Sequence, residues 1–199
     1  MALPYLVKDS DLRFIEKWIR ASSKWIERDL CLLAFFVGTP CLILELNRIT
    51  ISDVLSGSDK INKSFTIRGD KTFNDEYRTV HVKENLKKYL AKYLESIPNL
   101  FENEFLFRNA DNKPFAITTL KGNQRADSLT RHILDFLREG GIEQPSALSG
   151  RRTFDTKANN NGIHISVIHH LLGNKTLTTT KRLIDSDPLT MGELAAKAY

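Results

Sequence analysis

Several features that would place a chain outside the ordinary globular proteins are scarce or missing here. The 199 residues include only two cysteines, Cys31 and Cys41. Both lie in apolar sequence, so buried thiols are expected rather than a disulfide framework or a zinc site. No apolar run approaches the length that crosses a bilayer, and the first residues lack the charged-then-apolar layout of a signal peptide. These absences favour a globular protein of the reducing cytoplasm.

The composition that is present is typical of one folded domain. Hydrophobic residues make up 41% and charged residues 27% of the chain, which are ordinary fractions for a globular protein with a sizeable core. The formal net charge is +5 and the sequence pI is near 9.2. This mildly basic balance suits a polyanionic partner such as DNA without requiring one.

The pattern of apolar residues predicts a mainly helical chain with a few strands. Helical spacing indicates helices that begin at Asp9 or Ser10 and near Ser23, with Trp18 and Trp25 expected in the core. Further helices are expected over residues 83–94 and over 128–139, the second ended by a pair of glycines. Alternation over residues 64–68 and 78–82 predicts two strands joined by a polar turn, and residues 104–108 suggest a short buried strand or extended run.

The stretch from Leu148 to Pro188 is the most informative part of the sequence. A pair of arginines, Arg151 and Arg152, stands at a predicted helix start. An amphipathic helix closed by Gly173 follows, then a threonine-rich turn and a second helix that carries Lys181 and Arg182. The histidines on the first of these helices, His164, His169 and His170, are expected to have capping or surface roles rather than to bind a metal.

This order of residues resembles the active-site half of the tyrosine recombinases, the phage-integrase family that cuts and rejoins DNA through a phosphotyrosine link. The resemblance rests on Arg151, Arg152, Thr153 and Phe154, on Leu172 and Gly173, on Thr180, Ile184 and Asp185, and on Glu45, Leu46 and Asp53 further upstream. It implies an α/β, mostly α fold, with seven or more helices around a small antiparallel sheet near residues 51–82.

The resemblance also implies a domain organisation. It covers nearly the whole chain, so residues 1–188 are expected to form a single integrase-like catalytic domain. Residues 189–199 are expected to form a tail with a short helix able to dock on a neighbouring subunit. The helical core-binding domain that most family members place before the catalytic domain is expected to be absent.

Most of the reactive side chains of the family are replaced. Leu42 aligns with the first catalytic arginine, Leu148 with the first histidine, Asn174 with the second histidine or tryptophan, and Leu183 with the nucleophilic tyrosine. Leucine supplies neither a nucleophile nor a cation for a phosphate. The expectation is therefore a protein that is not an enzyme, in which Leu42, Leu148 and Leu183 pack together as an apolar plug. Tyr5, Tyr77 and Tyr199 remain as displaced nucleophiles in the opposing interpretation.

Two retained basic residues keep alternative roles open. Arg151 is either a buried partner of a carboxylate such as Glu45 or a phosphate contact, and Lys71 is either the lysine that protonates the leaving oxygen or a solvated turn residue. Arg131 lies on a helix face that either contacts the DNA backbone or is merely solvated. The predicted DNA contacts are Arg151, Arg152, Lys71, Lys121, Arg131, Lys175 and Arg182.

The leading hypothesis from the sequence is a catalytically inactive recombinase homologue that binds double-stranded DNA on the nucleoid as an accessory or regulatory factor. Its expected protein partners are an active recombinase or a second copy docked through the C-terminal tail. The first alternative is a protein-interaction module that keeps the fold without DNA binding, and the second is an active site-specific recombinase with a displaced nucleophile. No metal, cofactor or membrane is expected, because the family's reaction needs none.

Overall fold

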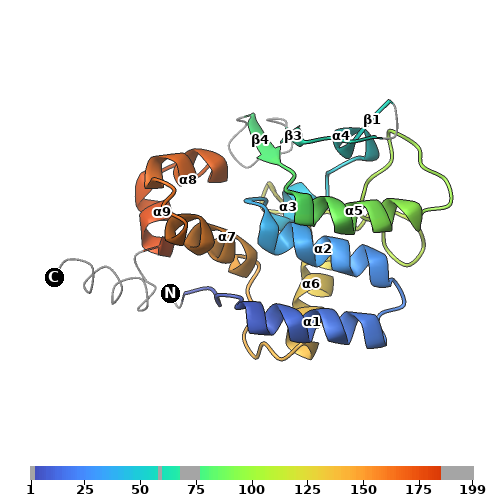
Figure 1. The fold of residues 1–199 in the computed structure, drawn as a ribbon, viewed down its shortest axis with the longest axis horizontal. Helices are drawn as coiled ribbons and strands as arrows, with labels where there is room; N and C mark the ends of the chain where they lie inside the picture. The colour runs from blue at the N-terminus through green and yellow to red at the C-terminus, as the bar shows by residue number, and fades with distance from the viewer. Residues whose placement is uncertain (1–2, 58–59, 68–76, 185–199) are drawn as a thin grey trace.

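The computed structural model describes residues 3–57, 60–67 and 77–184. Lys71, Asp185 and the tail 189–199 with Tyr199 lie outside these residues. Figure 1 shows α1 (Asp9–Ser22), α2 (Ile26–Gly38), α5 (Glu84–Glu95) and α6 (Asp127–Glu139) grouped together, with α7 (Ser149–Asn160), α8 (Ile165–Leu172) and α9 (Leu177–Ile184) forming a second group beside them. None of the described helices is long and apolar enough to span a membrane.

Helix α2 is the centre of the main core. Its sequence is apolar on nearly every side, and a helix with that pattern is stable only when neighbours cover it all round. It packs against α1, α5 and α7. Phe35 and Phe36 near its end are fully buried, and the Phe35 ring meets that of Phe107 edge-on with centroids 5.5 Å apart. Helix α2 therefore holds in place the segment that follows it, residues 39–46.

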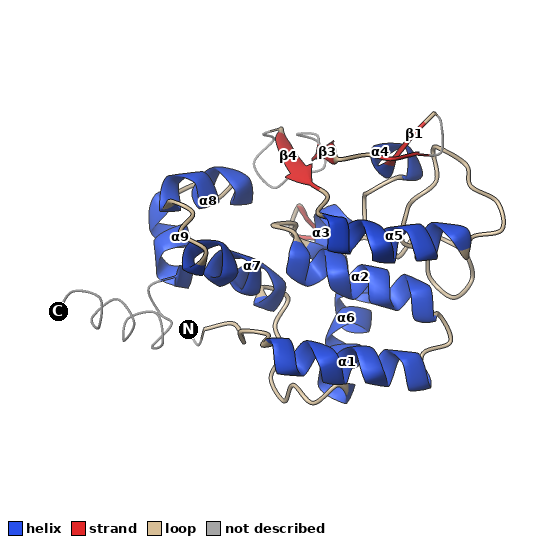
Figure 2. Cartoon of the chain, in the orientation of Figure 1, coloured by secondary structure: helices blue, strands red, loops and turns tan. Residues whose placement is uncertain are grey.

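Within the described residues, the strands pair into three separate two-stranded antiparallel sheets; strands are red in Figure 2. They are β1 (Leu55–Ser56) with β2 (Lys60–Ile61), β3 (Ser64–Ile67) with β4 (Arg78–His81), and β5 (Thr118–Leu120) with β6 (Asn123–Arg125). The expected mostly helical fold with small antiparallel sheets is confirmed. The β5–β6 hairpin was not predicted. Residues 104–108, expected as a short strand or extended run, form isolated bridges, Phe105 to Thr50 and Arg108 to Pro114.

Helices α7, α8 and α9 share a small core of their own, made of Ala158, Ile168, Leu172 and Ile184. Helix α8 ends at Gly173, which has φ of +60°, the left-handed conformation that a glycine cap adopts without strain. This end was predicted correctly. Two short helices, α3 (Ile43–Leu46) and α4 (Ile51–Val54), connect α2 to the first strands.

The expectation that Trp25 belongs to the core is wrong. Trp25 precedes the first residue of α2 and its side chain is 45% exposed, because the helix begins at Ile26 rather than near Ser23. The Arg28 guanidinium lies over its ring, 5.5 Å from the ring centroid. Trp18 is partly buried and packs against the core as expected.

Candidate active site

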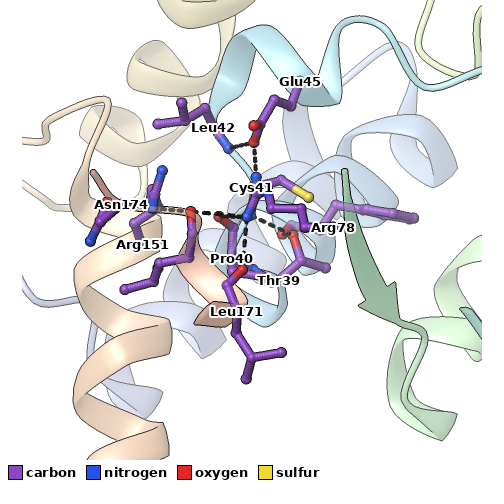
Figure 3. Close-up of polar contacts among 11 residues, drawn as sticks. Thr39, Pro40, Cys41, Leu42, Glu45, Arg78, Arg151, Leu171 and Asn174 are labelled. Carbon is purple, nitrogen blue, oxygen red and sulfur yellow. Dashed lines mark hydrogen bonds and ion pairs between the residues drawn. The ribbon is translucent and has the colours of Figure 1, made fainter. Parts of the chain in front are cut away.

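Arg78 on β4 is at the centre of a buried polar cluster formed by segments far apart in the sequence (Figure 3). Its Nη2 donates to Glu45 Oε2. Its Nη1 donates to the carbonyl oxygens of Pro40 at 3.2 Å, Leu171 at 2.9 Å and Leu172 at 3.2 Å. One guanidinium therefore links the end of α2, the short helix α3 and the end of α8.

The local sequence explains why Arg78 lies inside. In β4 the side chains alternate, and Arg78 and Val80 face inward while Thr79 and His81 are exposed. The carbonyl groups at the end of α8 have no partners within the helix and carry the partial negative charge of the helix C-terminus. Because Gly173 ends α8 at this point, Leu171 and Leu172 offer their carbonyl oxygens to the arginine.

Arg151 in the first turn of α7 joins the same cluster. Its Nη2 donates to Leu172 O at 2.6 Å and to Asn174 Oδ1 at 2.9 Å, so both arginines share the Leu172 carbonyl. The Asn174 amide in turn donates to Thr180 Oγ1 on α9 at 2.9 Å. Asn174 therefore fixes the position of the Arg151 guanidinium and ties it to α9.

The cluster contains more positive than negative charge. Glu45 is the carboxylate that accepts from Arg78, and the backbone N–H of Leu42 also donates to its Oε2 at 2.6 Å. Burial raises the pKa of Glu45 even though Arg78 opposes this shift. Burial and the neighbouring Arg78 charge lower the pKa of Arg151. The lowered pKa of Arg151 reflects a buried guanidinium that lies beside a second cation.

Asp155 lies one helical turn after Arg151 and is completely buried. Neither of its carboxylate oxygens has a hydrogen-bond partner among the described residues. Burial raises its pKa to about 7, although the Arg151 charge acts in the opposite direction. Asp155 is therefore a weaker counter-charge for the arginines than an ordinary aspartate, since a pKa of about 7 leaves it partly protonated at neutral pH.

The structure does not form the predicted apolar plug. Leu148, which directly precedes α7, is 43% exposed because it stands at the helix N-cap and not in the core. Leu42 is half-buried, and its backbone takes part in the polar cluster. The side chain of Leu183 lies outside the described part of the chain. The proposed Arg151–Glu45 pairing is also corrected, because Arg78 is the residue that donates to Glu45.

The predicted DNA contacts lie in different places. Lys175 is exposed directly after Asn174, and Arg182 is exposed on α9. Lys121 is at the tip of the β5–β6 hairpin and Arg131 is exposed on α6. Arg152 is buried, and its Nη1 donates to the carbonyl oxygen of Pro4 in the N-terminal segment. Of the predicted contacts, the fold brings Arg151 close to Lys175 through Asn174. It does not bring Arg152, Lys121 or Arg131 into that group.

Sequence reasoning missed Arg78. The strand over residues 78–82 was recognised, and its alternation places Arg78 on the same face as Val80 and Val82. An arginine on the apolar face of a strand needs a buried acceptor. That signal was available, although the identity of the acceptor depended on the three-dimensional fold.

Comparison with known proteins gives two curated relatives. The chain is 31% identical over 164 residues to tyrosine recombinase XerC of Treponema denticola. This match covers 79% of this chain and 52% of the relative. It is 28% identical over 173 residues to tyrosine recombinase XerA of Pyrococcus furiosus, with coverage of 84% and 53%. The chain therefore spans about half the length of these relatives. No family model matches the sequence.

Solved structures share the fold. The crystal structure of XerA recombinase superposes with a TM-score of 0.77 at 20% identity, over 100% of this chain and 64% of that one. The XerH site-specific recombinase has a TM-score of 0.65 at 22% identity, over 98% of this chain and 53% of that one.

The expectation that this protein is not an enzyme is wrong on this comparison, because both curated relatives are named as tyrosine recombinases, which are enzymes. Four replaced side chains were too narrow a basis for that conclusion. The sequence match and the shared fold together show that the described chain is a domain of the kind found as the catalytic domain of the tyrosine recombinases, or phage integrases.

Proposed function

We propose that this domain binds duplex DNA and takes part in DNA strand exchange of the tyrosine recombinase kind. The observation that carries the proposal is the buried pair Arg78 and Arg151, which share the Leu172 carbonyl and have one ion-paired carboxylate, Glu45, between them. A backbone phosphate supplies the negative charge that this cluster is short of.

The chemistry of the cluster suits a phosphate. Arginine presents a planar fork of donors that matches two phosphate oxygens, and hydrogen bonds between charged groups are roughly twice as strong as neutral ones. Arg151 is held by neutral acceptors, Leu172 O and Asn174 Oδ1, so its position is fixed while its charge is not neutralised by them. Lys175 adds an exposed cation beside Asn174.

DNA as the partner is supported by several solved structures that share the fold. They include XerH bound to a palindromic difH substrate, the Tn1549 transposon integrase in complex with transposon right end DNA, and a lambda integrase dimer bound to a core site. Because these proteins are less than 25% identical to this chain, their DNA complexes guide the proposal without assigning it.

Strand exchange needs a hydroxyl nucleophile that forms a bond to phosphorus while the bond from phosphorus to a sugar oxygen breaks, with a proton passing to that leaving oxygen. We assign this role to Tyr77, the exposed tyrosine among the described residues. It precedes Arg78 and its side chain is 72% exposed. Burial raises the pKa values of Tyr89 and Tyr93 to about 12, and the Tyr5 hydroxyl donates to Asp11.

The test is a search for a covalent protein–DNA species on a denaturing gel, using a nicked duplex that traps the intermediate. The wild type is expected to give a band of retarded DNA that protease removes, and Tyr77→Phe is expected to lose it. A band that survives Tyr77→Phe and disappears in Tyr199→Phe would move the nucleophile to the tail. No band on DNA that the protein demonstrably binds would contradict the strand-exchange part of the proposal.

A second candidate is a protein-docking role, with an active recombinase or a second copy of this chain as partner. It is favoured by a cavity of about 320 Å³ lined mainly by apolar groups of α1, α2, α5 and α7, among them Leu12, Leu33, Leu86 and Phe154. A protein that acts only in this way would have no affinity for DNA at any salt concentration.

A further inference from the structure

The β5–β6 hairpin contributes almost nothing to the core. All six of its strand residues are exposed, and the apolar side chain of Leu120 near its tip is 56% exposed. A two-stranded hairpin without a buried face is at best marginally stable in water. Its own packing therefore does not explain why the chain keeps this element.

The hairpin is nevertheless anchored at its base and along one strand. Thr118 Oγ1 donates to Asp127 Oδ2 at 2.5 Å, and Arg125 Nε lies 3.3 Å from Asp127 Oδ1. Gln124 Oε1 accepts from an Arg48 guanidinium nitrogen. Arg48 follows Glu45 by three residues, so the hairpin is attached to the segment that also holds the buried arginine cluster.

The tip is a two-residue turn between the paired residues Leu120 and Asn123. Both turn residues have positive φ, +49° at Lys121 and +78° at Gly122, as in the type I′ turns that favour Asn-Gly. A lysine is an unfavourable choice at the first position, because its Cβ strains the left-handed conformation. Backbone strain of this kind points to a function for the side chain that bears it.

The hairpin carries basic and amide side chains but no carboxylates. Residues 113–126 contain no aspartate or glutamate. Lys121 and Asn123 are exposed at the tip, whereas Gln124 and Arg125 are engaged by Arg48 and Asp127. Lysine and asparagine are side-chain types that hydrogen-bond to base edges, lysine being suited to guanine and asparagine to adenine. Exposed apolar side chains such as Leu120 can contact the thymine methyl group. A two-stranded ribbon also fits the width of the major groove.

We propose that the β5–β6 hairpin enters the major groove of the bound duplex and reads base edges with Lys121 and Asn123. This inference rests on the proposed DNA binding and adds to it the element that selects the sequence. The Arg48–Gln124 contact sets the angle of the hairpin relative to the segment that carries the arginine cluster. Phosphate binding at the cluster and base recognition at the hairpin are thus two separate contributions.

The test uses Lys121→Gly together with Asn123→Ala. A Gly-Gly pair suits a type I′ turn better than lysine before glycine does, so the double variant keeps the hairpin while removing a cation and an amide. Lys17→Gln on α1 is the matched control for the loss of an exposed positive charge. The preferred sequence is first selected by the wild type from a randomised duplex library. Affinity for that sequence and for an unselected duplex is then measured for each protein.

The double variant is expected to bind the selected duplex about tenfold more weakly, a discrimination of about 1.4 kcal/mol. Its affinity for the unselected duplex should fall much less, and Lys17→Gln should leave both affinities unchanged. Equal losses on both duplexes, or no loss on either, would overturn base reading by the hairpin while leaving DNA binding in place. Wild-type protein that binds neither duplex would overturn the proposed function itself, which is a distinguishable result.

Discussion

Single residues in the cluster have environments that no sequence pattern could specify. Leu42, Leu148 and Leu183 were identified by alignment with the family boxes, but their burial depended on helix ends, and Leu148 turned out to be exposed. Arg78 and Asp155 became important only once β4 and α7 were brought against α8 and α2. The positions of the family residues could thus be predicted from the sequence, whereas the hydrogen-bond partners that define the site could not.

Asp155 makes the folded protein sensitive to pH. Its pKa rises from 3.8 in the unfolded chain to about 7 in the folded protein. Between about pH 4 and pH 7 the unfolded chain releases this proton while the folded protein retains it, so the free energy of unfolding falls as pH rises through this range. A difference of about three pKa units corresponds to about 4 kcal/mol at most.

Asp155→Asn should remove this dependence and raise the free energy of unfolding at pH 8 by about 2 kcal/mol or more, as measured by urea denaturation at several pH values. Asp9→Asn is the control for a pH dependence in the opposite direction. The ion pair with Lys157 lowers the pKa of Asp9, so the stabilisation of the folded protein by this pair is lost as pH falls. A wild-type stability that is flat between pH 4 and pH 8 would contradict the assignment.

Among the elements, those with a regular apolar pattern could be predicted from the sequence, whereas the β5–β6 hairpin could not. Helices α5, α6 and α8 and the β3–β4 pair follow clear apolar periods, so they were expected within a few residues of their ends. The hairpin has no apolar face, since all six strand residues are exposed, and alternation cannot reveal it. Its turn, Lys-Gly, also departs from the usual hairpin signature.

Close contact between α7 and α2 depends on Gly150. A Cβ atom built on this residue would lie 2.1 Å from the carbonyl oxygen of Phe36, so a side chain there must push the two helices apart. Gly150→Ala is expected to lower the free energy of unfolding by about 3 kcal/mol. It would also displace the neighbouring Arg151.

The matched control is Gly38→Ala at the end of α2, where a Cβ atom meets nothing within 4 Å. This substitution should leave stability unchanged or raise it by up to about 1 kcal/mol. Urea denaturation of both variants gives the comparison. Equal stabilities for the two variants would show that α7 can move away from α2 at little cost.

At the level of the whole molecule, a formal charge of +5 combines with a buried arginine pair and a basic hairpin attached to the same segment. Each feature alone is common in proteins that do not bind nucleic acid. Together with the recombinase fold they favour the proposed contact with a polyanion, in which phosphate charge would offset the excess of the Arg78–Arg151 cluster.

The measurement that tests this account most directly is a titration with duplex DNA at about 50 mM and about 200 mM salt, for the wild type, Arg151→Gln and Lys17→Gln. We expect wild-type affinity to fall steeply as the salt concentration rises, and Lys17→Gln to behave like the wild type. Arg151→Gln should bind more weakly, and its slope of log affinity against log salt concentration should be smaller by about one unit, the contribution of one phosphate contact. Circular dichroism would verify that Arg151→Gln is folded. Absence of wild-type binding at the lower salt concentration, or unchanged binding by Arg151→Gln, would contradict the account.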